Sequence, residues 1–536
     1  MDKAIRELLK LKIKSRDELT AVKRNLAKKF GINILLNSEI FKEYQKLLAS
    51  KKIKANPVLE KILRKRTIRT MSGIAPVAVL TKPYPCPGKC AYCPTEKDVP
   101  QSYLSNEPAV MRAIRCNYNP YKQVQMRLQA LETNGHQPTK IELIVIGGTW
   151  SVLPDNYKYW YIASCFKACN NYGNKIQNPK SQIPNKSKIQ NLKKILLEQQ
   201  NLNEKSKYQI IGLTLETRPD YINEKELWQM RELGCTRVEL GVQAIDDKIL
   251  KLNKRGHGIK EIVDATKMLK NFGFKVTYHI MPGLPGSTAG KDLLMFKKLF
   301  SDERFQPDQI KFYPTVVTKG SLLYRWWKAG KYKPYTDKAL QNLIIKCKEI
   351  VPPYVRIIRL IRDIPKESII AGNTITNLRQ IMKDKGAKCN CIRCREAGDR
   401  QFTINNLQLT IINYKSSGGK EYFINYESKD KKILYGFCRL RLTNQGFDPE
   451  ASGSNPLAVS ASAIIRELHV YGELVPVGQN KKVQHSGLGK KLMLEAEKIA
   501  KDCKYKKIIV ISGIGAREYY KKLGYKLENT YMVKVF

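Results

Sequence analysis

Three cysteines with a Cys-x-x-x-Cys-x-x-Cys spacing are the residues best suited to chemistry in this chain. Cys86, Cys90 and Cys93 lie in the segment KPYPCPGKCAYCPT, directly after a short apolar run. Three thiolates on one tight loop can hold three irons of a 4Fe-4S cluster and leave the fourth iron open to a chelating ligand. The main alternative is zinc, but three cysteines without a nearby fourth ligand do not close a tetrahedral zinc site. The spacing therefore favours an iron–sulfur cluster.

This spacing is the signature of the radical SAM enzymes, which the region resembles. The resemblance implies that the amino and carboxylate groups of S-adenosylmethionine (SAM) bind the open iron, beside Tyr92. Two more motifs follow later apolar runs: Gly147-Gly148-Thr149 and Glu216-Thr217-Arg218. In the family, the glycines let the backbone approach the methionyl amino group, although Thr149 replaces the common Glu. Glu216 and Arg218 would lie near the ribose diol and the SAM carboxylate.

Short apolar runs alternating with helical stretches must position these motifs. The runs are IAPVAVL (74–80), IELIVI (141–146), QIIGLTL (209–215), VELGV (238–242), VTYHIM (276–281) and QIKFY (309–313). Runs of this length between helices favour repeated βα units and a parallel sheet. We therefore expect a partial (βα)6 TIM-like barrel over 71–330. Residues 171–207, rich in Asn, Lys and Ser, are interpreted as a flexible insertion without chemistry, with a helix in NLKKILLEQQ.

A second α/β domain is expected over 401–536, where long strands are followed by a helix. Its glycine motif, Gln484-His485-Ser486-Gly487-Leu488-Gly489, opens that helix. Such a turn presents backbone N–H groups and the positive end of the helix dipole, which suits a pyrophosphate. The motif resembles the acetyl-CoA loop of the GCN5-related acetyltransferases. In that fold a tyrosine lies near the thioester sulfur, and Tyr519 or Tyr520 would take this place. Packing of the two rings in a helix is the structural alternative.

Cys389, Cys391 and Cys394 form another triple, in CNCIRCREAG, within a linker over 331–400. A Cys-x-Cys-x-x-Cys pattern indicates a structural zinc knuckle that a fourth ligand would close, with Cys347 as one candidate. A second iron–sulfur cluster is the alternative.

A radical SAM domain followed by an acetyltransferase domain resembles the catalytic subunit of Elongator, here in a stand-alone form. The stretches RTMSGIAPVAVL, ETRPDY, GCTRVELGVQ, VPPYVRIIRLIRDIP, RELHVYG and YYKKLGY carry the resemblance, which runs from about Lys61 to Phe536. It implies a tRNA uridine carboxymethyl synthase. A 5′-deoxyadenosyl radical would take hydrogen from the methyl group of acetyl-CoA, and the resulting radical would add to C5 of the wobble uridine, U34. Loss of an electron and thioester hydrolysis would leave a carboxymethyl group.

The resemblance also implies further acetyl-CoA residues. Glu467, Leu468, His469 and Val470 match the strand of the family that binds acetyl-CoA. Lys140, in the first domain, matches a family lysine implicated with acetyl-CoA; an exposed lysine before a strand is the alternative. His469 is also compatible with a core histidine.

Charge indicates the partner. The 536 residues include 96 Lys and Arg against 48 Asp and Glu, a formal net charge of +48. Such an excess favours a polyanionic partner. The resemblance implies that this partner is a tRNA, bound at its anticodon stem-loop, and residues 1–70 are predicted to form a basic helical tRNA-binding region. An electron donor is also required, and a homodimer is left open.

The chain lacks a signal peptide and a run of ~18 apolar residues, so we expect a cytoplasmic protein without membrane association. Two rival functions remain at this point. One is a protein lysine acetyltransferase whose iron–sulfur domain is structural, and the other is a non-enzymatic tRNA-binding scaffold.

Overall fold

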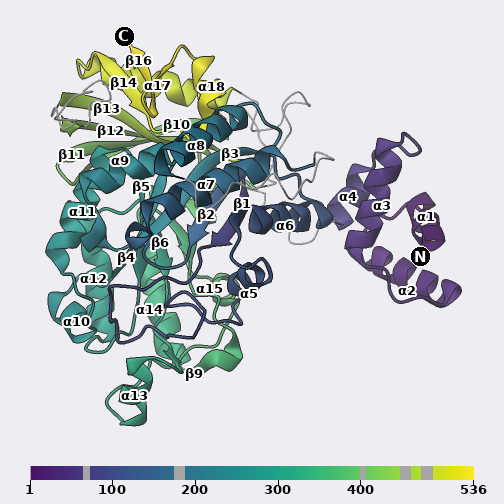
Figure 1. The fold of residues 1–536 in the computed structure, drawn as a ribbon, viewed down its shortest axis with the longest axis horizontal. Helices are drawn as coiled ribbons and strands as arrows, with labels where there is room; N and C mark the ends of the chain where they lie inside the picture. Colours follow the sequence, from purple (N-terminus) through teal and green to yellow (C-terminus); the bar gives the residue numbers. More distant parts are fainter. Residues whose placement is uncertain (1, 64–72, 174–187, 399–405, 447–459, 473–486) are drawn as a thin grey trace.

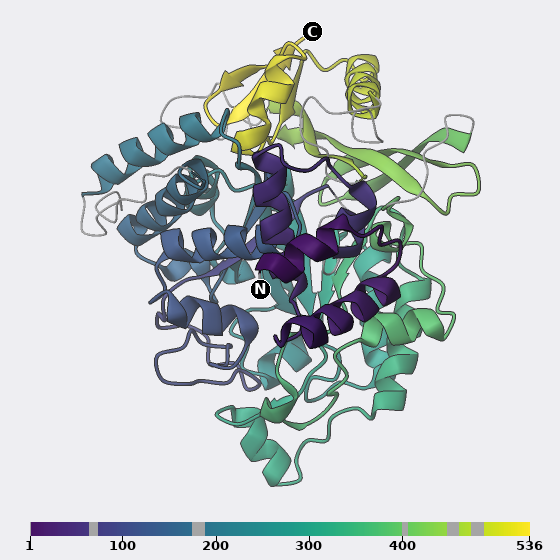
Figure 2. The ribbon, with the colours of Figure 1, turned by 90° about the vertical axis from the view of Figure 1, so that its right-hand side faces the viewer.

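The structure, a computed structural model, describes residues 2–63, 73–173, 188–398, 406–446, 460–472 and 487–536. Along the chain it forms a small helical body, a large barrel-like α/β body and a C-terminal α/β body (Figure 1). The C-terminal body covers one end of the barrel, and the N-terminal helices stand to one side (Figures 1 and 2). Within these ranges, no helix has both the length and the apolar composition needed to cross a bilayer.

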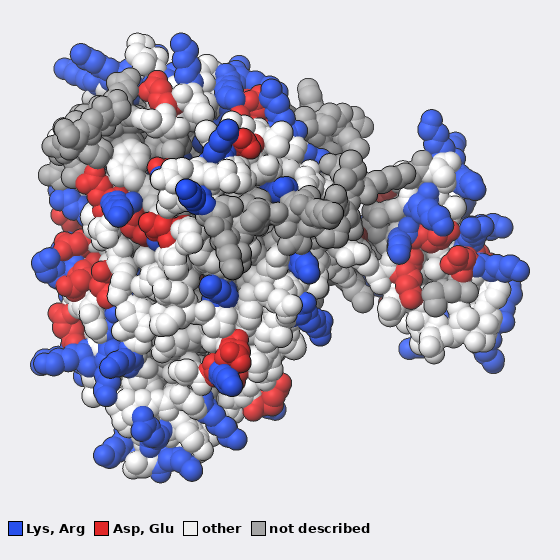
Figure 3. All heavy atoms as spheres, in the orientation of Figure 1, with Lys and Arg blue, Asp and Glu red and all other residues white. Residues whose placement is uncertain are grey.

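Four helices form the N-terminal body: α1 (Asp2–Lys10), α2 (Arg16–Phe30), α3 (Asn37–Ala49) and α4 (Pro57–Leu63). The Ser15 hydroxyl caps α2 by accepting from the backbone N–H of Glu18 at 3.1 Å. Apolar residues at helical spacing pack into a core of their own, which includes Leu8, Leu26 and Phe41. Of the region predicted over 1–70, residues 2–63 are described and form a folded helical body, and Figure 3 shows Lys and Arg over its outer side.

The barrel body contains one sheet of seven parallel strands in sequential order. They are β1 (Ala75–Leu80), β2 (Lys140–Ile146), β3 (Gln209–Thr217), β4 (Arg237–Gln243), β5 (Lys275–Ile280), β6 (Gln309–Phe312) and β8 (Arg356–Arg359). The six predicted runs are all strands. The seventh, β8, comes from the segment interpreted above as a linker, because two isoleucines between two arginines make too short an apolar run to stand out in the sequence.

Helices cover the outer side of this sheet (Figure 1). The longer ones are α6 (Pro120–Thr133), α7 (Asp155–Asn170), α8 (Ile189–Asn203), α9 (Glu224–Glu232), α11 (Ile259–Asn271), α12 (Ala289–Ser301) and α14 (Asp337–Glu349). The shorter elements are α5 (Pro108–Arg115), α10 (Asp247–Leu252), α13 (Leu322–Lys328), α15 (Leu378–Asp384), α16 (Ile392–Arg395), β7 (Val317–Thr318), β9 (Ile369–Ala371) and the 3-10 turns Trp150–Val152, Pro219–Tyr221 and Lys366–Ser368.

Helix α8 lies in the segment interpreted as a flexible insertion, of which residues 174–187 are outside the described ranges. It packs on α7 through buried side chains such as Leu192 and Leu196. Glu204, just after α8, pairs with Arg517 at 3.1 Å and with Lys521 at 2.7 Å in the C-terminal body. The end of the insertion therefore helps to join the two bodies.

The C-terminal sheet has the order β10-β11-β12-β13-β14-β16-β15. Its elements are β10 (Leu407–Ser416), β11 (Gly419–Ser428), β12 (Leu434–Gly446), β13 (Ser460–Val470), α17 (Leu488–Asp502), β14 (Lys507–Val510), a 3-10 turn (Ile514–Ala516), α18 (Arg517–Lys521), β15 (Lys526–Glu528) and β16 (Tyr531–Val535). Only the β13–β14 pair is parallel among its described pairings, and it ends at Ile465. Strand β13 runs on to Val470 beside β12.

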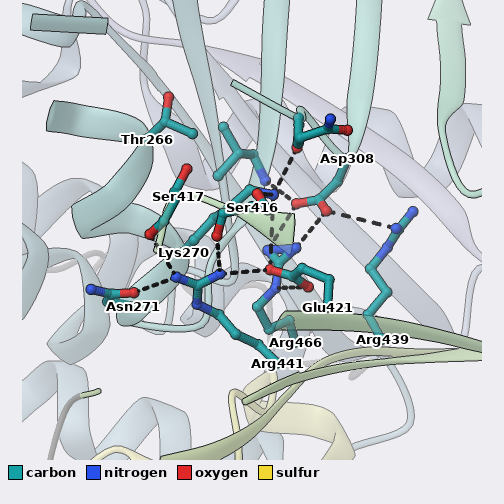
Figure 4. Close-up of polar contacts among 12 residues, drawn as sticks. Thr266, Lys270, Asn271, Asp308, Ser416, Ser417, Glu421, Arg439, Arg441 and Arg466 are labelled. Carbon is teal, nitrogen blue, oxygen red and sulfur yellow. Dashed lines mark hydrogen bonds and ion pairs between the residues drawn. The ribbon is translucent and has the colours of Figure 1, made fainter. Parts of the chain in front are cut away.

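Buried ion pairs fasten the C-terminal body to the barrel (Figure 4). Arg466 on β13 donates to Asp308, which precedes β6, at 2.9 Å, and to Glu421 on β11 at 3.1 Å. Its guanidinium also donates to the carbonyl of Phe274 at 2.7 Å. Burial would raise the pKa of the Asp308 carboxyl, but Arg466, Lys270 and Arg439 outweigh burial and lower that pKa from 3.8 to about 2. The carboxylate therefore stays ionised at the interface.

Two more cations complete this network. Lys270, on α11, donates to the Ser416 hydroxyl at 2.6 Å, and Arg441 donates to Asn271 at 2.6 Å. The barrel residues in these contacts lie where strands begin. Asp308 directly precedes β6, Phe274 directly precedes β5, and Asn271 ends α11, the helix that leads into β5. The C-terminal body therefore sits at the amino ends of the barrel strands.

Replacing Arg466 by Met should destabilise the joined bodies by about 3–5 kcal/mol, because Asp308 and Glu421 would stay buried without their partner. Urea unfolding monitored by circular dichroism measures this loss. A matched control is Arg304→Ala, which removes an ion pair to Asp302 made by an arginine side chain that is 54% exposed; its effect should be far smaller than that of Arg466→Met, because exposed ion pairs add little to stability. Equal effects of the two substitutions would contradict the importance of the buried network.

Candidate functional site

One cavity of about 1680 Å³ is lined by both large bodies. On the barrel side its wall is the inner face of the sheet, including Ala78, Glu142 and His279. On the other side it reaches His469 and Tyr519 of the C-terminal body. A pocket for one drug-sized ligand usually spans about 300–1,000 Å³. This cavity therefore has room for more than one small molecule.

The loop of Cys86, Cys90 and Cys93 lies at the carboxyl end of β1, and all three cysteines are free thiols. The backbone N–H of Ala91 donates to the Asn253 carbonyl at 3.0 Å, and the Ala91 carbonyl accepts from Leu323 at 2.7 Å. The loop is thus held from two sides.

The separation of the thiols bears on which metal group fits. Ligands of one zinc ion lie about 2.3 Å from the ion, and so within about 4.6 Å of each other, whereas cluster thiolates bind separate irons. Cys86, Cys90 and Cys93 are not among the groups of described residues whose ligand atoms all lie within 4.8 Å of one another. Two buried polar atoms near this loop, Tyr92 Oη and Arg218 Nη1, have no hydrogen-bond partner. The donor set and its spacing fit a 4Fe-4S cluster better than a single ion.

The glycine motif lies directly beside the cysteine loop. Gly147 has φ +136° and Gly148 has φ +98°, both in the region that favours glycine. A Cβ atom on Gly147 would lie 2.1 Å from Thr81 Oγ1, whereas a Cβ on Gly148 would find its nearest neighbour at 3.8 Å. Thr149 Oγ1 lies 3.8 Å from Cys86 Sγ. The structure thus brings the first two predicted motifs together.

The two charged residues of the Glu216-Thr217-Arg218 motif lie in different surroundings. Glu216 ends near the cavity, where it accepts a hydrogen bond from the Tyr103 hydroxyl at 3.1 Å and lies 3.5 Å from His279 Nδ1. Arg218 instead donates to both oxygens of Asp220, at 2.9 and 2.7 Å. A Cβ on Gly88 would lie 2.2 Å from Arg218 Nη1, so this guanidinium packs directly against the cysteine loop.

Charged side chains inside the barrel were not predicted. His279 on β5 lies 2.8 Å, Nε2 to Oε2, from Glu239 on β4, and Lys311 on β6 also pairs with Glu239. Burial would raise the pKa of Glu239, but Lys311, His279 and Arg237 outweigh it and hold that pKa well below its usual range. A signal was present in the sequence, because VELGV, VTYHIM and QIKFY each place an ionisable residue inside an apolar run.

At the opposite end, β13 brings part of the expected acetyl-CoA strand to the cavity. Glu467, Leu468 and His469 line it, while Val470 packs near Gly489. Glu467 is held by Arg439 at 3.0 Å. Beyond Ile465, β13 has β12 as its strand neighbour in the described structure, and its other edge is not paired with β14. An extended ligand can bond such an edge through the backbone.

The glycine motif of this body is described in part. Gln484, His485 and Ser486 lie outside the described residues. Gly487, with φ +81°, is the N-cap of α17, whose first residues are Leu488 and Gly489.

Tyr519 faces the start of α17, because a Cβ on Gly489 would lie 2.8 Å from the Tyr519 hydroxyl. Burial raises the pKa of Tyr519 to about 12, so the phenol keeps its proton at neutral pH. Tyr519 is 39% exposed, whereas Tyr520 is 7% exposed and packs with Tyr525 in the core. Tyr519 is thus the more accessible of the two rings.

Lys140 is the first residue of β2 and lines the same cavity. Its neighbour on β3, Gln209, packs against Gly515 of the C-terminal body. Burial lowers the pKa of Lys140. Strands β1 and β2 have six and seven residues and span ~20 Å at about 3.3 Å per residue. Lys140, at the amino end of β2, is therefore about one strand length from the cysteine loop at the carboxyl end of β1.

The second cysteine triple is compact. The sulfurs of Cys389, Cys391 and Cys394 all lie within 4.8 Å of one another, as ligands of one ion do. Hydrogen bonds from Cys389 and Cys394 lower the pKa of Cys391 well below its ordinary value. Cys347 does not join them; it is buried on α14 at a small, separate apolar cavity.

Comparisons with known proteins match these bodies. Residues 84–296 match the model of the radical SAM superfamily, 307–386 the Radical_SAM C-terminal domain and 461–533 the acetyltransferase (GNAT) domain. The chain is 43% identical over 479 residues to a tRNA uridine(34) acetyltransferase of Dehalococcoides mccartyi, covering 88% of this chain and 99% of the relative. It is 37% identical over 560 residues to human Elongator complex protein 3, covering 99% and 96%.

A solved structure agrees with these relatives. The archaeal Methanocaldococcus infernus Elp3 with an N-terminal deletion superposes with a TM-score of 0.71 and 37% identity, covering 87% of this chain and 99% of that one.

Substituting Gly147 by Ala should destabilise the fold more than substituting Gly148. Both positions have positive φ, which costs an alanine about 1–2 kcal/mol, but only a Gly147 Cβ would collide with Thr81. The free energies of unfolding of Gly147→Ala and Gly148→Ala, measured in urea, test this difference. Equal losses would show that backbone strain alone matters and that the close approach to Thr81 does not.

Proposed function

The chain belongs to the family of Elongator complex protein 3 and the tRNA uridine(34) acetyltransferases, and on that premise we propose that it is a tRNA carboxymethyluridine synthase. In this proposal the enzyme uses SAM and acetyl-CoA to place a carboxymethyl group on C5 of U34. The observation that carries it is the single cavity that extends from the cysteine loop to the acetyltransferase strand. A lysine acetyltransferase would have no need for an acetyl site that opens into a barrel.

The radical end of the cavity would hold the cluster on Cys86, Cys90 and Cys93. A reduced 4Fe-4S cluster and SAM, when bound, supply a 5′-deoxyadenosyl radical. Gly147 and Gly148 have no side chain, so the methionyl group of SAM could approach their backbone, beside Thr149 and Tyr92. Glu216, fixed by the Tyr103 hydroxyl, offers its carboxylate to the ribose diol. Arg218 acts indirectly in this proposal, by bracing the loop at Gly88.

The acetyl end would bind acetyl-CoA along β13 and at the start of α17. The N–H groups of the first turn of α17 suit the pyrophosphate, and the free edge of Glu467–Val470 suits the pantetheine arm. Tyr519 keeps its hydroxyl beside the helix start, where the thioester would pass. Lys140 lies where the barrel meets this body, so its ammonium can contact the anionic or carbonyl groups of the cofactor.

Addition of the acetyl-derived radical to C5 requires that the uridine later lose an electron and the C5 proton. In this proposal the C5 proton passes to the pair formed by Glu216 and His279, which line the cavity with Glu216 Oε1 3.5 Å from His279 Nδ1. The cluster, when bound, would also supply the acceptor for the electron that the uridine loses, so an external electron donor is needed to reduce the cluster first.

The partner RNA would meet a cationic surface. Net charge is +48, and Figure 3 shows Lys and Arg over the N-terminal helices and over the α13 end of the barrel. Tyr324 and Trp327 stack at 6.0 Å on α13 between the exposed Arg325 and Lys328. Aromatic rings among basic side chains are suited to unpaired bases. We therefore assign the anticodon stem-loop to the side of the barrel where α13 contacts the cysteine loop through Leu323 and Ala91.

Anaerobic incubation of the reconstituted chain with SAM, dithionite, tRNA and acetyl-CoA with a deuterated methyl group tests the proposal. Mass spectrometry should find deuterium in 5′-deoxyadenosine and carboxymethylated uridine in the digested tRNA. Cys90→Ser should abolish both products, whereas the exposed Cys503→Ser should keep them.

Three outcomes of this incubation would be informative failures. Absence of both products from a protein that carries its cluster would overturn the proposed function. Unlabelled 5′-deoxyadenosine would contradict hydrogen abstraction from the acetyl group. Acetylation of a lysine peptide without SAM would instead support the rival function.

We also propose that Cys389, Cys391 and Cys394 hold a structural zinc ion. Their mutual spacing supports one ion, and the site ties α16 to the barrel, since the N–H of Ile392 donates to the Val355 carbonyl at 2.9 Å. Cys391→Ser should lose the zinc found by metal analysis while iron stays unchanged, and its thermal midpoint should fall. Cys347→Ser should keep the zinc. Equal zinc content in Cys391→Ser and the unaltered chain would refute this site.

A further inference from the structure

We propose that Arg255 raises the reduction potential of the cluster held by Cys86, Cys90 and Cys93, through a hydrogen bond from its guanidinium to the Cys90 sulfur. This inference rests on the proposed cluster site. It assigns a task to a residue that lies outside every motif considered above.

The contact between Arg255 and Cys90 joins residues that are 165 positions apart in the chain. Arg255 Nη1 lies 3.2 Å from Cys90 Sγ, and the residue is 7% exposed. Its Nη2 donates to the carbonyl of Gly241 on β4. A Cβ on Gly241 would lie 2.5 Å from this nitrogen, so the bare glycine makes room for the guanidinium.

The backbone around Arg255 is fixed against the cysteine loop. Arg218 Nη2 donates to the Arg255 carbonyl at 2.8 Å, and Asp220 holds Arg218 in place. Two residues earlier, the Asn253 carbonyl accepts from Ala91 in the cysteine loop. The Asn253 amide is in turn bonded to the Pro285 carbonyl at 3.0 Å. The backbone of Arg255 is therefore held beside the cysteine loop, and the bond to the Gly241 carbonyl holds its guanidinium near Cys90.

The guanidinium keeps its charge at this site. An arginine guanidinium stays protonated in proteins, because its ordinary pKa is above about 12. The nearby carboxylate of Asp220 is already paired with Arg218 and lies 3.3 Å from His257. The positive charge of Arg255 is thus directed at the sulfur rather than cancelled by an acid.

A cation that donates to a ligand sulfur favours the reduced cluster. When the cluster takes up one electron, part of the added charge spreads onto its thiolate ligands. Hydrogen bonds to these sulfurs raise the potential, and a charged donor in a buried site acts more strongly than a neutral one. Arg255 would therefore make the cluster easier to reduce, and reduction must precede SAM cleavage.

Redox titration of the full-length, reconstituted chain tests this inference without tRNA, acetyl-CoA or SAM. Dithionite supplies the electron, and the electron paramagnetic resonance signal of the reduced cluster reports the midpoint potential. Arg255→Met, which keeps bulk but no donor, should lower the midpoint. Arg255→Lys, which keeps a charge without the planar fork, should lower it less. The control Lys254→Met removes a neighbouring exposed charge and should leave the midpoint unchanged.

The outcomes separate the inference from the function on which it rests. Equal midpoints in Arg255→Met and the unaltered chain, with equal iron content, would overturn the role of Arg255 and leave the proposed function standing. An equal shift in Lys254→Met would also overturn it, since charge alone would then explain the change. If Arg255→Met fails to retain a cluster, the midpoint of Arg255→Lys decides. An unaltered chain that takes up no cluster would overturn both proposals.

Discussion

The ion pair between Asp308 and Arg466 is the contact on which the joining of the two large bodies depends. Asp308 also accepts the N–H of Val276 at 2.9 Å, so the same carboxylate holds β5 beside β6 and the acetyltransferase strand beside both. Buried charges that water cannot solvate must stay paired, because an unpaired buried ion destabilises the folded state by several kcal/mol. The two bodies are therefore held in one relative position, and the cavity between them has a defined shape.

The interior of the barrel can stay hollow because its charges are paired across strands. A closed TIM barrel fills its interior with layers of branched apolar side chains. Here Glu142 pairs with Arg237 at 3.0 Å, and Glu239 pairs with Lys311 and His279. These groups hold one another against the wall instead of filling the centre. The result is a passage with paired charges in its wall, which runs from the cysteine loop to the C-terminal body.

The sequence predicts what is local and leaves out what depends on distance along the chain. The cysteine spacing, the six predicted strands and the helix that follows the second glycine motif are all encoded within a few residues, and the structure contains these strands and this helix. Strand β8 was missed because its apolar run is too short. The helix predicted in NLKKILLEQQ is α8, but its packing on α7 was not foreseen, because the polar residues around it favoured a flexible insertion. Arg255 could not be predicted, because its partner Cys90 is brought near only by folding.

The buried arginines also explain where the positive charge of the chain must lie. At the interface, Asp308, Glu421 and Glu467 face Arg466, Arg439, Arg441 and Lys270, so buried cations and acids nearly balance. More acids are used inside the barrel, where Glu142 and Glu239 pair with their cations. The whole chain carries only 48 acidic residues against 96 basic ones. The acids buried in these pairs are therefore a larger fraction of all acids than the buried bases are of all bases. Among the described residues most of the positive excess therefore lies on the outside, where a polyanion such as tRNA can neutralise it.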